Sequence, residues 1–313
     1  MSTTAAGQWL NQYVAPQLLQ EFKNYKVDFL LVLKGVPVSA ITADGVRWNR
    51  LINNVNFYVN SSGNFTPQKM TGEKIFVEWE KYDTDPTEVD DAEIRYLAYD
   101  KRSEVRVKHV EAMKLGIRDH VMWKLAPGDS TGTGMPVIRT TGKNDGTGRL
   151  RLTFEDMVNY LETVKKLNLE HQDELYMILC PEHVTDLILD NNSAKFFSDR
   201  QIFYDMETGK VRSIMGFKFF ENNAVLAYTA AGTKKPKGAA LIETDRVASL
   251  MFYAPETVYH IEKVKILYKP ETQDTRSANP TSEFRLQTYG LVDRRRDVGF
   301  GAVISGIAPD PEA

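Results

Sequence analysis

The sequence predicts an α+β fold from which a long hairpin projects. Apolar and polar residues alternate on both sides of a polar tip between Val55 and Trp79, which is typical of two paired strands. One long amphipathic helix is predicted from Ser103 to Leu125, and most other predicted strands follow Leu175. A compact enzyme rarely gives so much of its chain to an extended hairpin and a rod, so the pattern favours a protein that leans on other molecules.

The composition is that of an ordinary globular protein. The chain has 313 residues, of which 42% are hydrophobic and 26% are charged, so it can bury a sizeable core. Its formal net charge is -3 and its isoelectric point is near 6.0. Tight nucleic-acid binding needs clustered lysine and arginine, so we expect any contact with DNA to be loose and non-specific.

The lone cysteine and the apolar stretches exclude several other classes. Cys180 ends the apolar run that starts at Leu175, which predicts a buried structural thiol rather than a disulfide or a metal ligand. No secretory signal is visible at the N-terminus, so we expect synthesis in a cytoplasm. The most apolar stretch, Phe29–Ala40, is too short to cross a bilayer and is interrupted by Lys34 and Pro37, so no membrane contact is predicted.

The first elements of the chain are predicted to form an arm and the projecting hairpin. Residues Gln8–Phe22 have the pattern of a short amphipathic helix, and Ala43–Leu51 is predicted to be a loop. The hairpin strands then face each other through two sets of alternating residues: Val55, Phe57 and Val59, and Ile75, Val77 and Trp79. The tip, Ser61–Lys74, has too few apolar residues to build a core, so the hairpin is expected to lean on a neighbouring copy.

An acidic segment follows the hairpin. Carboxylates gather between Tyr82 and Glu93, and Pro86 forbids a helix across the centre of this segment. Two interpretations stay open at this stage. The segment is either a solvated turn before a strand, or a partner for a basic patch on another subunit.

A long one-sided helix is predicted next. After a short strand at Ile94–Tyr99, apolar residues recur at three- and four-residue spacing from Ser103 to Leu125, namely Val110, Met113, Ile117, Val121 and Leu125. At a rise of about 1.5 Å per residue, the helix would be about 35 Å long, enough to act as the backbone of a domain. His109 and His120 are expected to be surface groups on this helix.

The second half of the chain predicts a mixed subdomain followed by strands. Gly128–Gly148 is a predicted loop, and Thr153 begins a capping box for a helix at Phe154–Leu167. A buried strand at Leu175–Cys180 then leads into a helix at Pro181–Leu189. The further strands are predicted at Gly209–Gly216, Phe217–Glu221, Ala239–Ile242, Ser249–Phe252, Val258–Tyr268, Phe284–Val292 and Phe300–Ile307, with a polar insert at Lys269–Ser282.

The motifs that could carry catalysis fit their contexts poorly. Gly128 to Gly132 matches the G-x-S-x-G pattern around Ser130, but a nucleophile elbow needs a strand before it and a helix after it, and here a helix ends and a loop follows. Gly142–Gly148 lacks the residue order of a phosphate-binding loop. The histidines have no metal-ligand spacing, and the acidic segment lacks the glycine and terminal glutamate of a calcium loop. We therefore predict no catalytic residue, no cofactor and no metal.

The densest positive run is Arg294, Arg295 and Arg296, at the end of a predicted strand. It is either a solvated strand end or an interaction site. For a chain with almost no net charge, pairing with the carboxylates of another subunit fits better than sequence-specific reading of DNA.

Several of these segments together resemble one family. They are the acidic turn Pro86-Thr87-Glu88-Val89-Asp90, Tyr99-Asp100-Lys101-Arg102 before the long helix, Pro181-Glu182-His183, Ile214-Met215-Gly216-Phe217, and Tyr289-Gly290. In this order, and with the arm and hairpin before them, they resemble the major capsid proteins of tailed bacteriophages with the Hong Kong 97 phage-type fold. The resemblance covers nearly the whole chain.

The resemblance implies a division of the chain and a function. Residues 1–49 would be an N-terminal arm, 50–82 an E-loop hairpin, 83–149 a peripheral domain with a spine helix, 150–239 an axial domain, and 240–313 a return to the peripheral domain. Proteins of this family assemble as hexamers and pentamers into an icosahedral shell around double-stranded DNA, with each E-loop lying over an adjacent subunit. The chain would then be a structural protein of the virion, made in the cytoplasm of a bacterial host.

The resemblance also implies partners. Contacts with other capsid subunits are expected at Phe57, Tyr58, Phe65, Phe76, Trp79, Asp90, Asp91, Arg294, Arg295 and Arg296. Some relatives join a hairpin lysine covalently to an asparagine of another subunit, for which Lys69 or Lys74 with Asn279 would be the residues here. No long charged extension precedes the arm, so we expect a separate scaffolding protein or unaided assembly, together with portal and decoration proteins.

Three alternatives remain. An encapsulin-type nanocompartment shell resembles the same fold but encloses an enzyme. A tail or adaptor protein would form rings rather than closed particles. A serine hydrolase using Ser130 would lose ester hydrolysis on Ser130→Ala.

Overall fold

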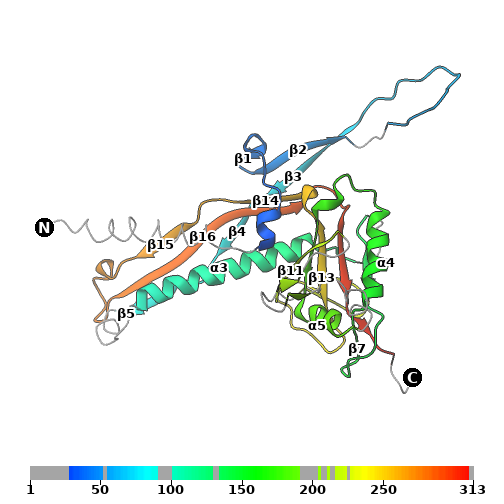
Figure 1. Ribbon diagram of the computed structural model, residues 1–313. Helices are drawn as coiled ribbons and strands as arrows, with labels where there is room; N and C mark the ends of the chain where they lie inside the picture. The colour runs from blue at the N-terminus through cyan, green and yellow to red at the C-terminus, as the bar shows by residue number, and fades with distance from the viewer. Residues whose placement is uncertain are drawn as a thin grey trace.

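The main body of the described chain consists of two β-sheets and one long helix, with shorter elements attached to them (Figure 1). The computed structural model describes residues 28–51, 55–90, 101–129, 134–190, 204–205, 210–211, 216–223 and 226–309. Of the predicted segments, the helix at 8–22, the strand at 94–99, Asp91 and Ser130 lie outside the described residues. None of the described helices combines the length and the apolar composition that crossing a membrane requires.

The first sheet is built around one long strand, β16 (Thr281–Arg294). On one side it pairs antiparallel with β14 (Thr257–Ile261) and β15 (Lys265–Lys269). On the other side it pairs antiparallel with β4 (Glu80–Asp83) and β5 (Thr87–Asp90). From Thr281 to Gly290 the residues of β16 alternate between half-buried and buried, because only one face of the strand packs on the core.

The long helix predicted from the sequence is present as α3 (Lys101–Leu125). It packs across this sheet. Its buried residues include the five apolar positions expected from the spacing: Val110, Met113, Ile117, Val121 and Leu125. They share one cluster with Phe284, Leu286 and Val292 of β16. The helix therefore acts as a rod against which the sheet is laid, and Figure 1 shows the two running side by side.

The second sheet has six strands, and two helices pack against it. Its strands run in the order β11 (Lys218–Glu221), β8 (Leu175–Leu179), β13 (Arg246–Tyr253), β17 (Phe300–Ile304) and β6 (Val137–Arg139), with β12 (Ala227–Tyr228) paired to β13. The helices are α4 (Phe154–Lys165) and α5 (Pro181–Leu189). Thr153 and Asp156 form the predicted capping box of α4, and Pro181 is in the first turn of α5, which confirms both helix starts.

Alternate residues of the second sheet face two different cores. Leu250 and Phe252 of β13 pack in the same cluster as α3, which we call the spine helix. Met251 and Tyr253, their neighbours on the same strand, pack with α4 and α5 on the other face. The first cluster is thus shared by both sheets and holds the two halves of the chain together.

The hairpin projects from the first sheet as a separate three-stranded sheet (Figure 1). It consists of β1 (Ile41–Thr42), β2 (Gly45–Leu51) and β3 (Gly72–Glu78). Val46 lies opposite Val77 and Trp48 opposite Ile75. The predicted hairpin is therefore present, but its first strand lies earlier in the chain than expected.

The prediction of a strand at 55–60 and of a loop at Ala43–Leu51 is wrong. Residues 55–71 have no strand pairing, and Val55, Phe57 and Val59 are 83%, 89% and 72% exposed. The paired strand is β2 because Val46 and Val77 bury their side chains against Val258 and Leu291 of the first sheet. The alternating residues at 55–59 have no surface of the described chain to pack on, so their pattern does not determine a strand there.

Three other expectations need correction. Residues 239–242 form no strand, and Leu241 and Ile242 are exposed. The strand expected at 258–268 is divided into β14 and β15. The acidic segment is not a simple turn: up to Asp90 it forms β4 and β5, which both pair with β16 and are separated at Pro86, where the ladder lacks a donor.

His109 is also buried, although the sequence predicts a surface group. It is 6% exposed, its two ring nitrogens lie 2.7 Å from the hydroxyl of Thr84 and 2.8 Å from that of Thr87, and its ring meets Phe284 edge-on. The threonine hydroxyls satisfy the imidazole, so its burial leaves no polar nitrogen without a partner.

The remaining elements are short. The strands are β7 (Arg149–Leu150), β9 (Tyr204–Asp205), β10 (Lys210–Val211) and β18 (Gly306–Ile307), of which β7 pairs with β18 and β9 with β10. Single 3₁₀ turns occur at Asp28–Val32, Val38–Ala40, Gln172–Glu174, Ala254–Glu256 and Glu271–Gln273.

Candidate assembly interface

The projecting loop, residues 55–71, exposes a set of large apolar side chains. Figure 1 shows it extending beyond the three-stranded sheet, away from the rest of the chain. The exposed apolar side chains of the loop and of the adjoining strand are Val55, Phe57, Tyr58, Val59, Phe65, Met70 and Phe76. Several large exposed apolar side chains gathered in one short segment are typical of an interaction site, whereas single exposed apolar residues are ordinary.

The loop has little internal structure to hold it. Tyr58 and Phe65 approach each other with ring centroids 5.6 Å apart, and the Asn56 side chain lies 3.4 Å from the Tyr58 hydroxyl. Lys69 is the one charged residue between Val55 and Thr71, so few charges oppose the burial of this surface. Burial is favourable by roughly 25 cal/mol per Å² of apolar surface, so the aromatic rings are the groups that gain most from a partner.

The predicted contact residues of the hairpin differ in their surroundings. Phe57 and Phe65 are 89% and 68% exposed, and Tyr58 and Phe76 are exposed as well. Trp79 is half-buried at the root of the hairpin, where its indole nitrogen donates to the Thr42 carbonyl over 3.1 Å. The first four side chains are free to meet another molecule, and the role of all five in assembly stays a prediction.

Three of the predicted charged contacts have partners within the chain. Asp90 accepts a hydrogen bond of 3.2 Å from the Asn279 side chain. Arg294 pairs with Asp297 at 3.1 Å and also donates to the Ala126 carbonyl, and Arg296 pairs with Glu256 at 2.6 Å. The Nε atom of Arg295 is buried without a hydrogen-bond partner among the described residues. Arg294 and Arg296 thus fasten the end of β16 to its own surroundings, and the predicted pairing of the three arginines with another subunit stays a prediction.

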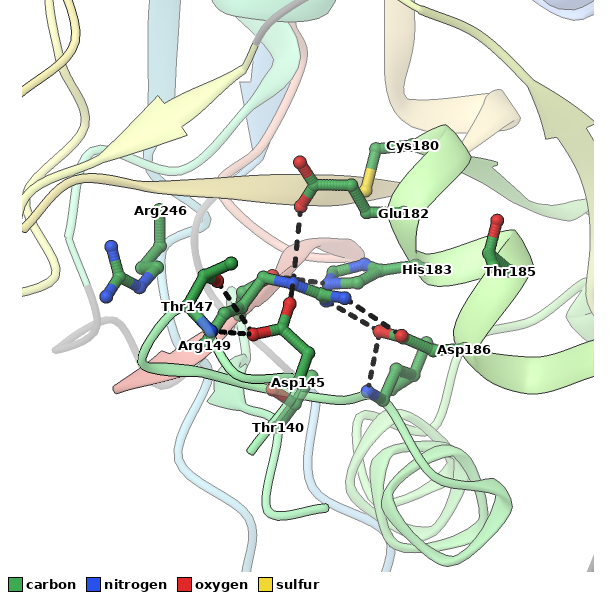
Figure 2. Close-up of polar contacts among 12 residues, drawn as sticks. Thr140, Asp145, Thr147, Arg149, Cys180, Glu182, His183, Thr185, Asp186 and Arg246 are labelled. Carbon is green, nitrogen blue, oxygen red and sulfur yellow. Dashed lines mark hydrogen bonds and ion pairs between the residues drawn. The ribbon is translucent and has the colours of Figure 1, made fainter. Parts of the chain in front are cut away.

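Sequence reasoning missed a buried charge network around Arg149, shown in Figure 2. The guanidinium donates two hydrogen bonds to Asp186, of 2.6 Å and 2.9 Å, and one of 2.9 Å to Asp145. Asp186 also accepts from the backbone N–H of Leu152. Hydrogen bonding to Asp186 raises the pKa of Arg149, so the guanidinium keeps its charge.

Asp145 is the half-buried second carboxylate of the same network. Burial alone would raise the pKa of its carboxyl, but hydrogen bonds from Thr147 and Arg149 outweigh burial and hold the pKa at about 2. The two hydrogen bonds from Thr147 are 2.7 Å and 2.8 Å long. The network therefore fixes the loop before β7 against α5.

A second buried cluster places a histidine between two serines. His183 Nδ1 lies 2.7 Å from Ser249 Oγ, and Nε2 lies 2.9 Å from Ser305 Oγ. Burial lowers the pKa of His183 to about 4 and raises that of the neighbouring Cys180 thiol to about 11, so both groups are neutral. None of the four side chains is more than 3% exposed, so no substrate can reach the serine and histidine pair. The cluster joins α5 to the second sheet.

The described residues contain no other arrangement that indicates catalysis. No three His, Cys, Asp or Glu side chains among them are grouped so that they could hold a metal ion. Of the G-x-S-x-G segment, Gly128 and Asp129 follow the end of the spine helix, and the serine itself lies outside the described residues. The projecting loop is therefore the feature of the described chain that most needs a functional explanation.

Comparison with known proteins decides the fold. No protein-family model and no curated protein sequence matches the chain. Solved structures do. The capsid protein of cyanophage Pam1 superposes with a TM-score of 0.62 and 11% identity, covering 89% of each chain. The acid-stable capsid of Helicobacter pylori bacteriophage KHP30 gives 0.60 and 9%, covering 90% of this chain and 91% of that one.

The capsid protein of cyanophage P-SCSP1u gives a TM-score of 0.58 and 13% identity, covering 89% of this chain and 87% of that one. The chain has the tailed-phage capsid fold. This confirms the α+β class and the Hong Kong 97 phage-type architecture expected from the sequence. The likeness extends over about nine-tenths of the chain.

Proposed function

We propose that the chain is the major capsid protein of a tailed bacteriophage. Copies assemble as hexamers and pentamers into an icosahedral shell that encloses double-stranded DNA, and the protein resides in the virion capsid. The capsid fold supports this, and the single observation that carries it is the exposed apolar surface of the projecting loop. The protein acts through repeated contacts and not through catalysis.

The loop requires a partner, and a second copy of the chain is the natural one. A protrusion of one copy that binds a different surface of the next copy forms a heterologous contact, and such contacts close into rings when the rotation between copies allows it. Phe57, Tyr58 and Phe65 are the anchors of this contact, because aromatic side chains dominate interface energies. Every copy then both donates a loop and receives one.

The division of the chain that we propose keeps the expected order: an arm (1–49), an E-loop hairpin (50–82), a peripheral domain (83–149 and 240–313) and an axial domain (150–239). Two bounds need adjustment, because β2 (Gly45–Leu51) pairs with β3 in the hairpin, and because β13 and β17 belong to the second sheet. Scaffolding, portal and decoration proteins are the further partners. With a net charge of -3, the shell holds packaged DNA only through loose, non-specific contacts.

The first test is to express the chain in a bacterium and to image the product by electron microscopy, alone and with any scaffolding protein found beside its gene. Closed shells, tubes or capsomers support the proposal. Monomers under all conditions would contradict it, closed rings would favour a tail or adaptor protein, and shells purified with an enzyme inside would favour a nanocompartment.

The second test replaces the loop aromatics. Phe57→Ser combined with Phe65→Ser is expected to raise the protein concentration needed for assembly at least tenfold, since truncating a buried aromatic anchor costs about 2 kcal/mol or more and each 1.4 kcal/mol is a factor of ten. Light scattering against protein concentration measures this threshold. Ile242→Ser is the matched control, because Ile242 is 63% exposed but lies outside the loop, and its threshold should stay the same.

A further inference from the structure

On the C-terminal side of the hairpin, a single residue links the projecting sheet to the first sheet. Strand β3 belongs to the projecting three-stranded sheet and ends at Glu78, whereas β4 belongs to the first sheet and begins at Glu80. Only Trp79 lies between them. The loop lies at the far end of the hairpin (Figure 1), so a small rotation at this junction and in the packing of Val46 and Val77 on the first sheet would move the loop relative to the spine helix.

Glu80 is held at this junction by three side chains. His120 Nε2 lies 2.6 Å from Oε2, the Tyr82 hydroxyl donates to the same oxygen over 3.0 Å, and Lys124 Nζ lies 2.8 Å from Oε1. His120 and Lys124 are one turn apart on the spine helix. We call these four residues the Glu80 clamp. It joins the root of the hairpin to the rod that carries the main core.

The clamp has close packing behind it. The Tyr82 ring lies against Gly290 of β16, where a Cβ atom would come within 2.6 Å of the ring, so a side chain at this position would displace Tyr82. His120 meets the Tyr82 ring edge-on and stacks on Trp123. The side chains of His120 and Glu80 are 19% and 28% exposed, so the contacts of the clamp are partly shielded from water.

We propose that the Glu80 clamp positions the projecting loop for its contact with the next copy, and that the clamp loosens in mild acid. Glu80, His120 and Lys124 are thus positioning residues of the interface, and this inference rests on the proposed function of the loop. A clamp that holds the loop in one direction removes in advance part of the entropy that binding would otherwise cost.

The charges around His120 give the sign of the pH dependence. They are Glu80 from β4, Lys124 from its own helix and Lys237 from the segment before β13, and the neutral Tyr82 ring of β4 also faces the imidazole. Burial lowers the pKa of His120 below 6.5 and outweighs the attraction of Glu80, and both lysines lower it further. An open clamp with a hydrated His120 takes up a proton near pH 6.5, so acid favours opening.

Glu80 responds in the same direction. Burial alone would raise its pKa, but the contacts with Lys124 and His120 lower it overall. Because its pKa is lowered in the closed clamp, the ionised Glu80 carboxyl stabilises the closed state, and this stabilisation is lost when the carboxyl is protonated. A carboxyl takes up its proton at a lower pH than a histidine. Opening through His120 is therefore the step expected between pH 7.5 and 5.5.

The test measures the direction of the loop in dilute, unassembled subunits. Spin labels are attached at Ser62→Cys on the loop and Glu155→Cys on α4, both exposed positions, while the native Cys180 is buried and stays unlabelled. Electron–electron resonance then gives the distribution of label distances. The variants are Glu80→Gln, His120→Gln and, as a matched control on the exposed side of the spine helix, Glu111→Gln.

At pH 7.5 we expect one main distance in the wild type and in Glu111→Gln. In Glu80→Gln the population outside that distance should rise roughly three- to tenfold, the effect expected for weakening charge-assisted hydrogen bonds. The wild type should also broaden at pH 5.5 relative to pH 7.5, because acid favours the open clamp. His120→Gln keeps a donor for Glu80 but cannot titrate, so its distribution should not change with pH.

Identical distributions for the wild type and Glu80→Gln at both pH values would overturn the proposal, as would a wild-type loop with no preferred distance. Circular dichroism checks that each variant folds, and Lys124→Gln replaces Glu80→Gln if the latter does not. Because the labels are read in single subunits, a positioned loop in a protein that never assembles would refute the proposed function and leave the clamp intact.

Discussion

At the residue scale, Arg149, Asp186 and His183 show how residue types that often serve catalysis can instead hold a fold together. Their partners come from distant segments: Arg149 is 37 residues from Asp186, and His183 is 122 residues from Ser305. No spacing in the sequence brings these groups together. They could not be predicted, because their meeting depends on how α5 packs on the second sheet.

Arg149→Met is expected to destabilise the subunit strongly. It would leave Asp186, whose side chain is 1% exposed, as a buried charge without its partner, and breaking such a pair costs about 3–5 kcal/mol. Urea unfolding followed by circular dichroism measures the loss. Lys166→Met removes an exposed pair with Glu162 and should leave the midpoint almost unchanged, so equal midpoints for the two variants would contradict the role given to Arg149.

His183 is expected to make the subunit less stable in acid. Its pKa is about 4 in the folded chain and near 6.5 when unfolded, so the unfolded chain binds the extra proton between these values. The free energy of unfolding should therefore fall as the pH drops from about 6.5 to 4, by up to about 1.4 kcal/mol per pH unit.

The control for this effect is His183→Gln, which can still bond to a serine but does not titrate. The difference in unfolding free energy between the wild type and the variant, measured at each pH from 7 to 4.5, should change with that slope. A difference that stays constant across the range would show that His183 keeps its proton affinity on folding.

At the scale of elements, local patterns were predictable and pairings between distant segments were not. The spine helix follows from its apolar spacing, and α4 follows from the capping residues Thr153 and Asp156, because both signals lie within a few residues of each other. The strand that pairs with β3 could not be predicted from the sequence. Alternation at Val55 to Val59 is as regular as that of β2, but only Val46 has the first sheet to pack against.

The candidate site was predictable to a similar extent. The exposure of Phe57, Tyr58 and Phe65 follows from a segment too polar to build its own core. The intramolecular partners of Arg294 and Arg296 did not follow, because Asp297 and Glu256 lie beside them only after β16 is placed. The Glu80 clamp was missed for the same reason, since His120 is 40 residues away from Glu80.

At the scale of the whole molecule, the capsid fold persists where almost no sequence identity does. Identities of 9–13% accompany TM-scores of 0.58–0.62 over about nine-tenths of the chain. In this chain the fold consists of a rod, a sheet laid on it, a second sheet sharing its core, and a loop directed away from all three. Exposed apolar side chains on such a loop indicate a surface that another molecule covers. In the proposed shell that molecule is a second copy of the chain.

The most direct measurement is photo-crosslinking from the loop. A photoreactive phenylalanine analogue is placed at Phe57, equal amounts of ¹⁵N-labelled and unlabelled protein are mixed under assembly conditions, and crosslinked peptides are identified by mass spectrometry after irradiation. If the loop lies over the next copy, crosslinks join labelled to unlabelled chains, and a denaturing gel shows a ladder of covalent oligomers. Crosslinks found only within single chains would mean that the loop folds back on its own subunit and does not bind the next copy.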